Sequence, residues 1–281
     1  MIHAYFLIIM HGITKRVAVA MSGGIDSAVA AMLLKDKGYD CIGVFMRNWD
    51  KADDESEQCT IEEDRIHMRQ ICNRLGIPDY EVSFVKEYWS KVFTPFINTC
   101  QGGIATPNPD VYCNRLVKFQ DFQNHIREKF GIEYFATGHY ARLVNSPFEQ
   151  LHGSNQAMKA TTMTPRLLRG IDEIKDQSYF LALTQVFCDE ISLSQWKICF
   201  IGIMMLLCNY VIPQGENLKN VLFPLGNYHK SEIREMAKSR FSDLKVLTKR
   251  ESTGICFIGK RCFPDFMQQY ITFTPGRYDS I

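Results

Sequence analysis

The chain has 281 residues, which is enough for one large domain or two modest ones. Its hydrophobic content of 46% and charged content of 22% are ordinary for a soluble globular protein, and its net charge of +1 does not by itself indicate a nucleic-acid partner. None of the ten cysteines forms a Cys-x-x-Cys pair, which argues against paired-cysteine zinc and iron–sulfur sites. Because no secretory signal is convincing, a reduced intracellular compartment is expected rather than a disulfide scaffold.

The first strong pattern is an apolar run at residues 17–21, followed by Ser22-Gly23-Gly24-Ile25-Asp26-Ser27 and a helical pattern over residues 27–37. A strand that leads through glycines into a helix N-terminus forms an anion site, because the first N–H groups of the helix lack partners and the helix dipole favours negative charge. Gly23 and Gly24 let the backbone approach an oxyanion, and the hydroxyls of Ser22 and Ser27 can donate hydrogen bonds.

This loop differs from the two commoner phosphate loops. It lacks the Lys-Ser/Thr of a Walker loop and the G-x-G-x-x-G of a dinucleotide-binding loop. Ser-Gly-Gly-x-Asp-Ser instead resembles the pyrophosphate loop of the ATP pyrophosphatases, which split ATP into AMP and pyrophosphate while adenylating a substrate. The alternative is an ordinary strand–turn–helix corner made of small residues.

Strand and helix patterns alternate over the first 140 residues. Further strands are predicted at residues 39–45, 80–85 and 134–137, and further helices at residues 62–75, 87–99 and 114–130. On the helix at 62–75, the residues expected on the buried side are Ile66, Ile71, Cys72 and Leu75. This order predicts a parallel sheet covered on both faces. Ligands bind beyond the carboxyl ends of such strands, so one crevice is expected to collect Ser22–Ser27, Met46–Asn48 and Gly138–His139.

The segment at residues 106–114 combines two prolines, the carboxylate of Asp110 and the thiol of Cys113 just before a predicted helix. The prolines fix φ and stiffen the loop, and one turn of backbone aims Asp110 and Cys113 into the same space. A helix start favours the thiolate and makes the cysteine nucleophilic. The alternative is that Cys113 is a small buried apolar residue, as most free cysteines are.

After residue 150 the pattern loosens, with a short strand predicted at residues 167–170 and a helix that opens at Lys175–Phe180. Residues 198–212 form a mostly apolar run of 15 residues, which is shorter than the roughly 20 residues of a membrane span and could equally be a buried helix. Residues 227–261 carry nine Lys or Arg against four acids, which suits either a phosphate backbone or a helix face with ion pairs. Cys256 lies in a glycine-flanked, basic loop and is a second candidate thiolate.

Taken together, these segments resemble the tRNA-specific 2-thiouridylases, which place sulfur on the wobble uridine of certain tRNAs. The resemblance covers most of residues 16–275, and two blocks are specific to that family: Asn-Pro-Asp-x-x-Cys-Asn at residues 108–114 and Ser-Thr-Gly-Ile-Cys-Phe-Ile-Gly at residues 252–259. It implies an α/β fold with a doubly wound, mostly parallel sheet of adenine-nucleotide alpha-hydrolase-like (ATP pyrophosphatase) topology, plus a partial second domain. It also implies ATP and Mg2+ as cofactors, tRNA and a persulfide sulfur donor protein as partners, and no stable membrane association.

The resemblance further implies roles for individual residues. Cys113 is similar to the nucleophile, Cys256 to the cysteine that receives sulfur as a persulfide, and Asp110 to the general acid/base, with the two cysteines ending as a transient disulfide. The implied nucleotide contacts are Ala20, Met21, Ser22, Gly23, Gly24, Ile25, Asp26, Ser27, Met46 and Gly138. The implied contacts to tRNA or to its flipped-out uracil are Asn108, Pro109, Asp110, His139, Lys175, Asp176 and Gln177. No residue is assigned as a metal ligand, and which sulfur attacks C2 stays open.

The chain departs from the family pattern in three places. Residues 187–212 fall between two matching blocks, so we interpret them as an insertion, with an unspliced intron or a gene-model error as the hypothesis. The loop at residues 102–105 lacks the arginine usually placed there. The family has a central domain and a C-terminal β-barrel after the catalytic domain, and the barrel is expected to be absent here.

The expected organisation is therefore a leader at residues 1–15, a catalytic domain at 16–186, the insertion at 187–212, and the rest of the catalytic domain with a partial central domain at 213–281. Two other functions are considered: a non-catalytic, truncated ATP- or tRNA-binding fragment, and another ATP pyrophosphatase such as an amide-forming ligase. Family members work in mitochondria or in the bacterial cytoplasm. The leader lacks acidic residues, which slightly favours a mitochondrial location, with the cytoplasm as the alternative.

Overall fold

The computed structural model describes residues 15–49, 61–103, 106–144, 165–184, 218–248 and 262–272. Its centre is a five-stranded sheet in the order β3-β2-β1-β4-β7, in which every neighbouring pair is parallel. The strands are β1 (Arg16–Met21), β2 (Asp40–Arg47), β3 (Asp79–Ser83), β4 (Tyr134–Ala136) and β7 (Val221–Leu222). The predicted mostly parallel α/β sheet is thus confirmed.

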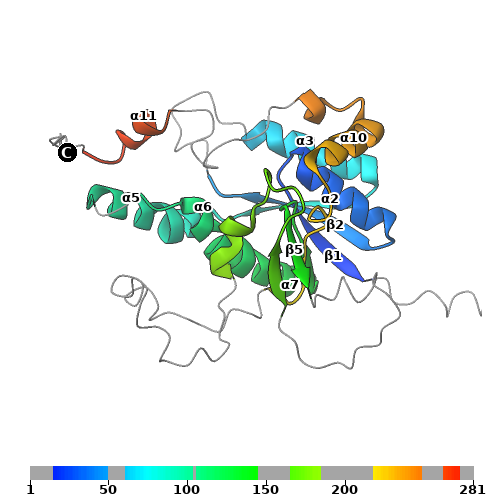
Figure 1. Ribbon diagram of the computed structural model, residues 1–281, viewed down its shortest axis with the longest axis horizontal. Coiled ribbons are helices and arrows are strands. Elements are labelled where there is room, and N and C mark those ends of the chain that lie inside the picture. Colours follow the sequence, from blue (N-terminus) through cyan, green and yellow to red (C-terminus); the bar gives the residue numbers. More distant parts are fainter. Residues whose placement is uncertain are drawn as a thin grey trace, which may run out of the picture.

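Helices cover both faces of the sheet, because side chains alternate between faces along each strand (Figure 1). On β1, Val17, Val19 and Met21 belong to the core beneath α2 (Ile25–Asp36), α3 (Ile61–Leu75) and α10 (Lys230–Phe241). Ala18 belongs to the core on the opposite face. That face is covered by two helical rods: α4 (Val85–Tyr88), η2 (Trp89–Phe93) and α5 (Thr94–Gln101), then α6 (Pro109–Tyr112), η3 (Cys113–Phe122) and α7 (Gln123–Phe130).

The second rod begins earlier than the sequence predicts. The predicted start was residue 114, whereas the first helical residue is Pro109. The side chain of Asn108 caps the helix by accepting a hydrogen bond from the N–H of Asp110 at 3.0 Å, and a proline suits the first helical position because no N–H is needed there. Cys113 therefore lies one turn inside the helix and not before it, beyond the four N–H groups that lack partners at a helix start.

Two predictions about α3 and the strands were wrong or incomplete. Ile66 was expected on the buried side of α3 but is 51% exposed, because the inward face follows helical spacing through Met68, Ile71, Cys72 and Leu75. No pattern in the sequence predicted β5 (Ala141–Val144), which pairs antiparallel with β6 (Arg166–Arg169). The two-residue β7 was not predicted either, because it is too short to leave a pattern. The helix expected to open at Lys175 begins at Ser178 as a 3-10 helix, η4 (Ser178–Thr184).

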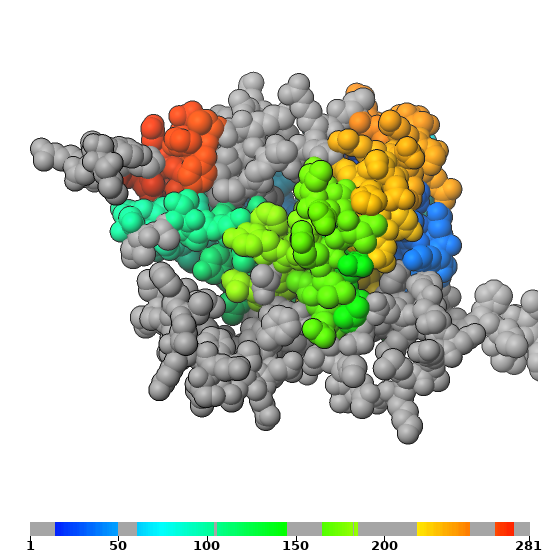
Figure 2. All heavy atoms as spheres, viewed as in Figure 1, coloured from blue at the N-terminus to red at the C-terminus, as the bar shows by residue number. Residues whose placement is uncertain are grey.

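Near the end of the described chain, α11 (Phe263–Met267) lies against the α4–α5 rod (Figure 2). Phe266 and Tyr270 contact the ring of Phe93 with centroid distances of 6.2 and 4.9 Å, and Phe266 also lies 6.5 Å from Trp49. A short 3-10 helix, η8 (Lys245–Thr248), follows α10. None of the helices in the described ranges is long and apolar enough to cross a membrane. The leader up to residue 14 and the predicted insertion lie in parts of the chain that the structure does not describe.

Candidate active site at the carboxyl edge of the sheet

The loop between β1 and α2 has the backbone shape of an anion site. Gly23 has a φ of +69°, a left-handed conformation that favours glycine. A Cβ atom on Gly23 would lie 2.2 Å from the carbonyl oxygen of Asp64 in the first turn of α3, so only a glycine fits. Gly24 is the N-cap residue of α2, and because glycine has no side chain, the first turn of the helix has no side-chain cap. This geometry directs the positive end of α2 toward the loop.

The two serines of this loop have different roles in the structure. The hydroxyl of Ser27 accepts a hydrogen bond from the N–H of Ser22 at 3.1 Å and donates to the carbonyl oxygen of Gly24 at 3.1 Å. Ser27 is 3% exposed, so this hydroxyl closes the loop. The Ser22 hydroxyl lies 3.2 Å from that of Ser27 on an exposed residue, where it can also meet a ligand.

Asp26, in the first turn of α2, is held by two residues that are distant in the sequence. The ammonium group of Lys230 donates to both of its carboxylate oxygens at 2.6 and 2.8 Å, and the Tyr140 hydroxyl donates to one of them at 2.8 Å. The Lys230 side chain is 10% exposed and that of Asp26 is 37% exposed. The ammonium also lies 5.6 Å from the centre of the Tyr140 ring. These contacts connect the anion loop to the segment after β4 and to α10.

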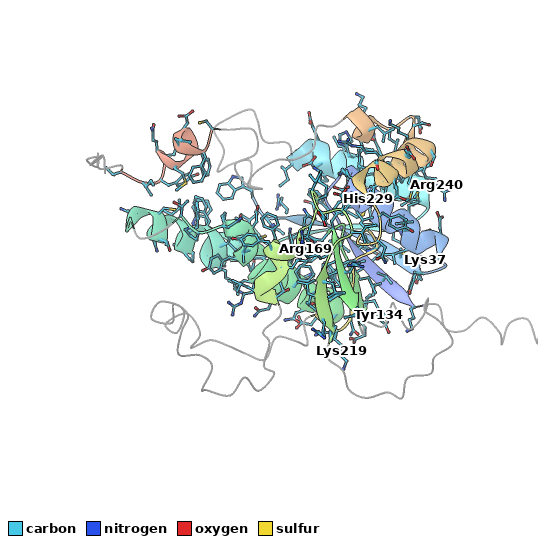
Figure 3. The ribbon with its side chains drawn as sticks, viewed as in Figure 1. Lys37, Tyr134, Arg169, Lys219, His229 and Arg240 are labelled. Carbon is cyan, nitrogen blue, oxygen red and sulfur yellow. The ribbon has the colours of Figure 1, made fainter. Side chains whose placement is uncertain are left out.

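Lys230 and Tyr140 were not predicted as part of this site. Lys230 is the first residue of α10, next to the N-cap His229, and Figure 3 marks the two ends of this helix with His229 and Arg240. A lysine in a first helical turn is disfavoured by the helix dipole, and this mismatch is the pattern that could have identified it. The N–H of Lys230 also donates to the Asp172 carboxylate at 2.9 Å, which holds the pKa of Asp172 below its usual range.

Gly138 brings the segment after β4 against the anion loop. A Cβ atom on Gly138 would lie 2.9 Å from the carbonyl carbon of Asp26 and 2.9 Å from the nitrogen of Ser27, so the two backbones are in direct contact. The convergence predicted for these two segments is therefore found. Met46 is the second-to-last residue of β2 and packs against the core on the opposite face from Phe45.

His139 follows Gly138 and is neutral at physiological pH. Its Nδ1 atom lies 2.7 Å from the Thr137 hydroxyl, and its ring packs 5.9 Å from Phe119. Burial, and to a smaller extent the positive charge of Lys118, lower the pKa of His139 to about 3. A contact between His139 and an RNA would therefore not depend on a positive charge on this ring.

Cys113 is buried beside the residue that follows β2. It is 2% exposed and lies at the start of the π-helical segment η3, a rare geometry that is frequent at functional sites. The amide nitrogen of Asn48 lies 3.8 Å from the Cys113 sulfur. Asp110 precedes Cys113 by three residues on the same helix, and Asn108 and Pro109 form its cap and first position. The predicted segments around β2 and residues 108–113 thus meet on one side of the sheet edge.

The Asp176 and Gln177 side chains are directed toward the chain itself. Asp176 accepts hydrogen bonds from the N–H of Gly170 at 2.8 Å and from the Ser178 hydroxyl at 2.7 Å. Burial alone would raise the pKa of Asp176. The hydrogen bonds and the charge of Arg169, which is labelled in Figure 3, outweigh the effect of burial, so the pKa of Asp176 is lowered. The Gln177 side-chain oxygen accepts from the N–H of Tyr140 at 3.1 Å.

These contacts form a bridge between the two halves of the site. The N–H of Gln177 donates to the carbonyl oxygen of Tyr140 at 3.0 Å, next to the anion loop. Three residues later, the carbonyl oxygen of Phe180 accepts from the Asn114 side chain at 3.2 Å, next to Cys113. Residues 177–180 therefore fix the Cys113 helix relative to the anion loop. The backbone N–H of Lys175 donates a hydrogen bond to the Asp172 carboxylate at 3.2 Å.

One predicted residue of the site is not placed by the structure. Cys256 lies in a stretch that the structure does not describe, so its distance from Cys113 is not defined. Among the described residues, no group of three or more His, Cys, Asp or Glu side chains could hold a metal ion.

The parallel sheet, with helices on both faces and a glycine loop at its carboxyl edge, defines an α/β domain with an anion site. Residues 15–192 and 209–260 match the family described as the tRNA methyl transferase HUP domain, and the chain belongs to this family. The unmatched residues between the two matching parts fall inside the predicted insertion at 187–212.

Curated relatives are similar over almost all of this chain. It is 43% identical over 261 residues to the tRNA-specific 2-thiouridylase MnmA of Bacillus velezensis, an alignment that covers 93% of this chain and 57% of the relative. The same values hold for the tRNA-specific 2-thiouridylase MnmA of Bacillus cytotoxicus. The chain thus spans a little over half the length of these relatives.

A solved 4-thiouridine synthetase–RNA complex with bound ATP is 13% identical and aligns with a TM-score of 0.44 over 92% of this chain and 50% of that chain. The NMN synthetase of Francisella tularensis is 16% identical and aligns with a TM-score of 0.42 over 94% of this chain and 75% of that chain.

Proposed function

We propose that this chain catalyses the ATP-dependent 2-thiolation of the wobble uridine in tRNA. In this reaction ATP adenylates the C2 oxygen of the uracil, and a persulfide sulfur then replaces that oxygen to give 2-thiouridine. The supporting observation is the placement of an anion loop and a buried cysteine at one sheet edge, joined by residues 177–180, in a member of this family. Relatives at 43% identity are named tRNA-specific 2-thiouridylases.

The anion loop fits the phosphates of ATP. Gly23 holds a conformation and a close contact with Asp64 that exclude any side chain, and α2 directs its positive end to the same place. Mg2+ is part of this proposal, as a Lewis acid that stabilises charge on the phosphate oxygens. The nearest loop carboxylate, Asp26, is engaged by Lys230, so we expect the ion to be bound mainly by the phosphates.

The chemistry requires an activated C2, because a uracil carbonyl is a poor electrophile. We propose Cys113 as the nucleophile, Asp110 as the general acid/base, and Asn108 with Pro109 as contacts to the extruded base. Sulfur would arrive as a persulfide on Cys256 from a donor protein. The Cys113 thiolate attacks the inner sulfur of this persulfide, the bond to the outer sulfur breaks, and Cys113 and Cys256 end as a transient disulfide. The outer sulfur, either released as sulfide or already bound to C2, replaces the oxygen that leaves with AMP.

We propose that Lys175 and His139 contact the tRNA, together with the segment that Asp176 and Gln177 shape. The side chains of Asp176 and Gln177 are used in hydrogen bonds to Gly170, Ser178 and Tyr140, which supports a role in holding the loop rather than in reading the RNA directly.

We also propose a mitochondrial location for the protein, and microscopy of the tagged chain would test it.

The ATP-dependent half of the proposal can be tested by pyrophosphate release. Full-length chain is incubated with ATP, Mg2+ and unmodified tRNA, and pyrophosphate is measured with and without the tRNA. We expect release to depend on tRNA and to fall at least about tenfold in Gly23→Ala, in which a methyl group would collide with Asp64. Gly38→Ala is the control, because Gly38 also has a positive φ but lies in open space.

Two outcomes would favour the other functions. ATP binding without tRNA-dependent pyrophosphate release would indicate a non-catalytic fragment, for which the coverage of 57% of the relatives' length is the motivating observation. Pyrophosphate release that depends on ammonia or an amine instead of tRNA would indicate an amide-forming ligase.

A further inference from the structure

Asn48 is a buried side chain that the proposed reaction does not yet use. It is the first residue after β2 and is 8% exposed, and its amide nitrogen lies 3.8 Å from the sulfur of Cys113. This distance is within hydrogen-bonding range for the large sulfur atom. Cys113 itself is 2% exposed, so the contact is shielded from bulk water.

The backbone on both sides of Asn48 is fixed by packing. Before it, the carbonyl oxygen of Arg47 accepts a hydrogen bond from the N–H of Phe84 at 2.8 Å, which continues the β2–β3 pairing. After it, Trp49 is 6% exposed and stacks on Trp89 at a centroid distance of 5.2 Å. Asn48 is therefore held at the Cys113 sulfur by its neighbours in the chain.

The other end of the amide shows that packing alone does not explain an asparagine here. Its side-chain oxygen is buried and has no hydrogen-bond partner among the described residues. A buried acceptor without a partner destabilises a fold, so an apolar residue would be the more stabilising choice at this position. Retaining the amide is consistent with a role for its nitrogen at the thiol.

We infer that Asn48 is a positioning residue that donates a hydrogen bond to the Cys113 sulfur and favours its thiolate form. A hydrogen bond to the charged form of a group stabilises that form, and the low exposure of this pair strengthens the effect. The thiolate is the nucleophilic form of cysteine, so Asn48 would prepare Cys113 for attack. The contact stands on the geometry alone, whereas its use in sulfur transfer rests on the proposed function.

The test is the pH dependence of Cys113 alkylation, without ATP or tRNA. Full-length chain is treated with iodoacetamide from about pH 5 to about pH 10, and modification of Cys113 is read by peptide mass spectrometry. We expect the pH of half-maximal rate to rise by about 1 in Asn48→Ala, and further in Asn48→Asp, which keeps the size of the side chain but places a carboxylate beside the sulfur. The pH of half-maximal rate is compared in place of the absolute rate, because the Ala variant also opens access to the thiol.

The control variant is Gln123→Ala, which removes another buried side-chain amide from the same helical rod, ten positions from Cys113. We expect it to leave the Cys113 profile unchanged. The inference is overturned if the three Cys113 profiles of wild type, Asn48→Ala and Asn48→Asp coincide, or if wild-type Cys113 shows no thiolate reactivity up to about pH 10. Either result would leave the proposed thiolation open to its own test, because alkylation requires no substrate.

Discussion

Replacing Lys230 with methionine removes the ammonium group that neutralises Asp26 and keeps most of the side-chain volume. At the observed separations of 2.6 and 2.8 Å, the gross Coulomb attraction is about 6 kcal/mol for an effective dielectric constant of about 20. Desolvation of both charges offsets most of this attraction, and water reaches Asp26, which is 37% exposed. We therefore expect Lys230→Met to lower the free energy of unfolding by about 2 kcal/mol.

The two partners should not be equivalent. In Asp26→Asn, the ammonium of Lys230 stays 10% exposed and loses the counter-charge of Asp26. In Lys230→Met, the carboxylate of Asp26 keeps its hydrogen bond from the Tyr140 hydroxyl and its access to water. We expect Asp26→Asn to cost about 3 kcal/mol, more than Lys230→Met. The double variant should cost less than the sum of the two single variants by about 2 kcal/mol.

The assay is urea unfolding of wild type, both single variants and the double variant, followed by circular dichroism. A coupling energy below about 0.5 kcal/mol would refute the ion pair as a stabilising link between α2 and α10. So would a larger loss from Lys230→Met than from Asp26→Asn, because that order contradicts the burial of the two groups.

Three further predictions concern other parts of the structure. In urea unfolding, Gly23→Ala should lower the free energy of unfolding by about 3 kcal/mol and Gly38→Ala by about 1 kcal/mol. Both glycines have a positive φ, but only at Gly23 would an added Cβ atom meet backbone atoms, so equal losses would contradict this reasoning. Between pH 7 and pH 5, wild type should lose about 2 kcal/mol more stability than His139→Gln. The reason is that an unfolded histidine binds a proton near its ordinary pKa of 6.5, whereas the pKa of folded His139 is lowered to about 3; parallel pH curves would exclude this. Phe266→Ala should cost about 3 kcal/mol by the same method, since this ring is 1% exposed, and a loss below about 1 kcal/mol would mean that α11 does not depend on the aromatic contacts.

Much of the fold could be predicted because its elements leave regular patterns. The runs that became β1 and β2 are buried and nearly continuous in apolar residues, and Gly38, Gly76 and Gly131 have the positive φ expected at helix ends. The errors occurred where spacing is ambiguous. Ile66 is apolar but lies off the inward face of α3. The two residues of β7 depend on their pairing with β4, which local pattern does not encode.

The site could be predicted only in part, because several of its contacts join residues that are distant in the sequence. The glycine loop is contiguous and its shape follows from local rules, whereas the helix that begins at Pro109 was predicted to begin at residue 114. Lys230 is 204 positions from Asp26, and only the packing of α10 on α2 brings them together. The contact between Asn48 and Cys113 spans 65 positions and depends on the order of strands in the sheet.

The formation of 2-thiouridine tests the proposed function of this protein without an intermediate assumption. Full-length chain, unmodified tRNA, ATP, Mg2+ and a persulfide donor are incubated together, and nucleosides from the digested tRNA are analysed by mass spectrometry. The matched variants are Cys113→Ser at the site and Cys41→Ser in the core of β2, where burial raises the pKa of the thiol to about 12. We expect 2-thiouridine from wild type and from Cys41→Ser, and none from Cys113→Ser. Thiolation at the wild-type level by Cys113→Ser, or none by wild type, would refute the proposed function.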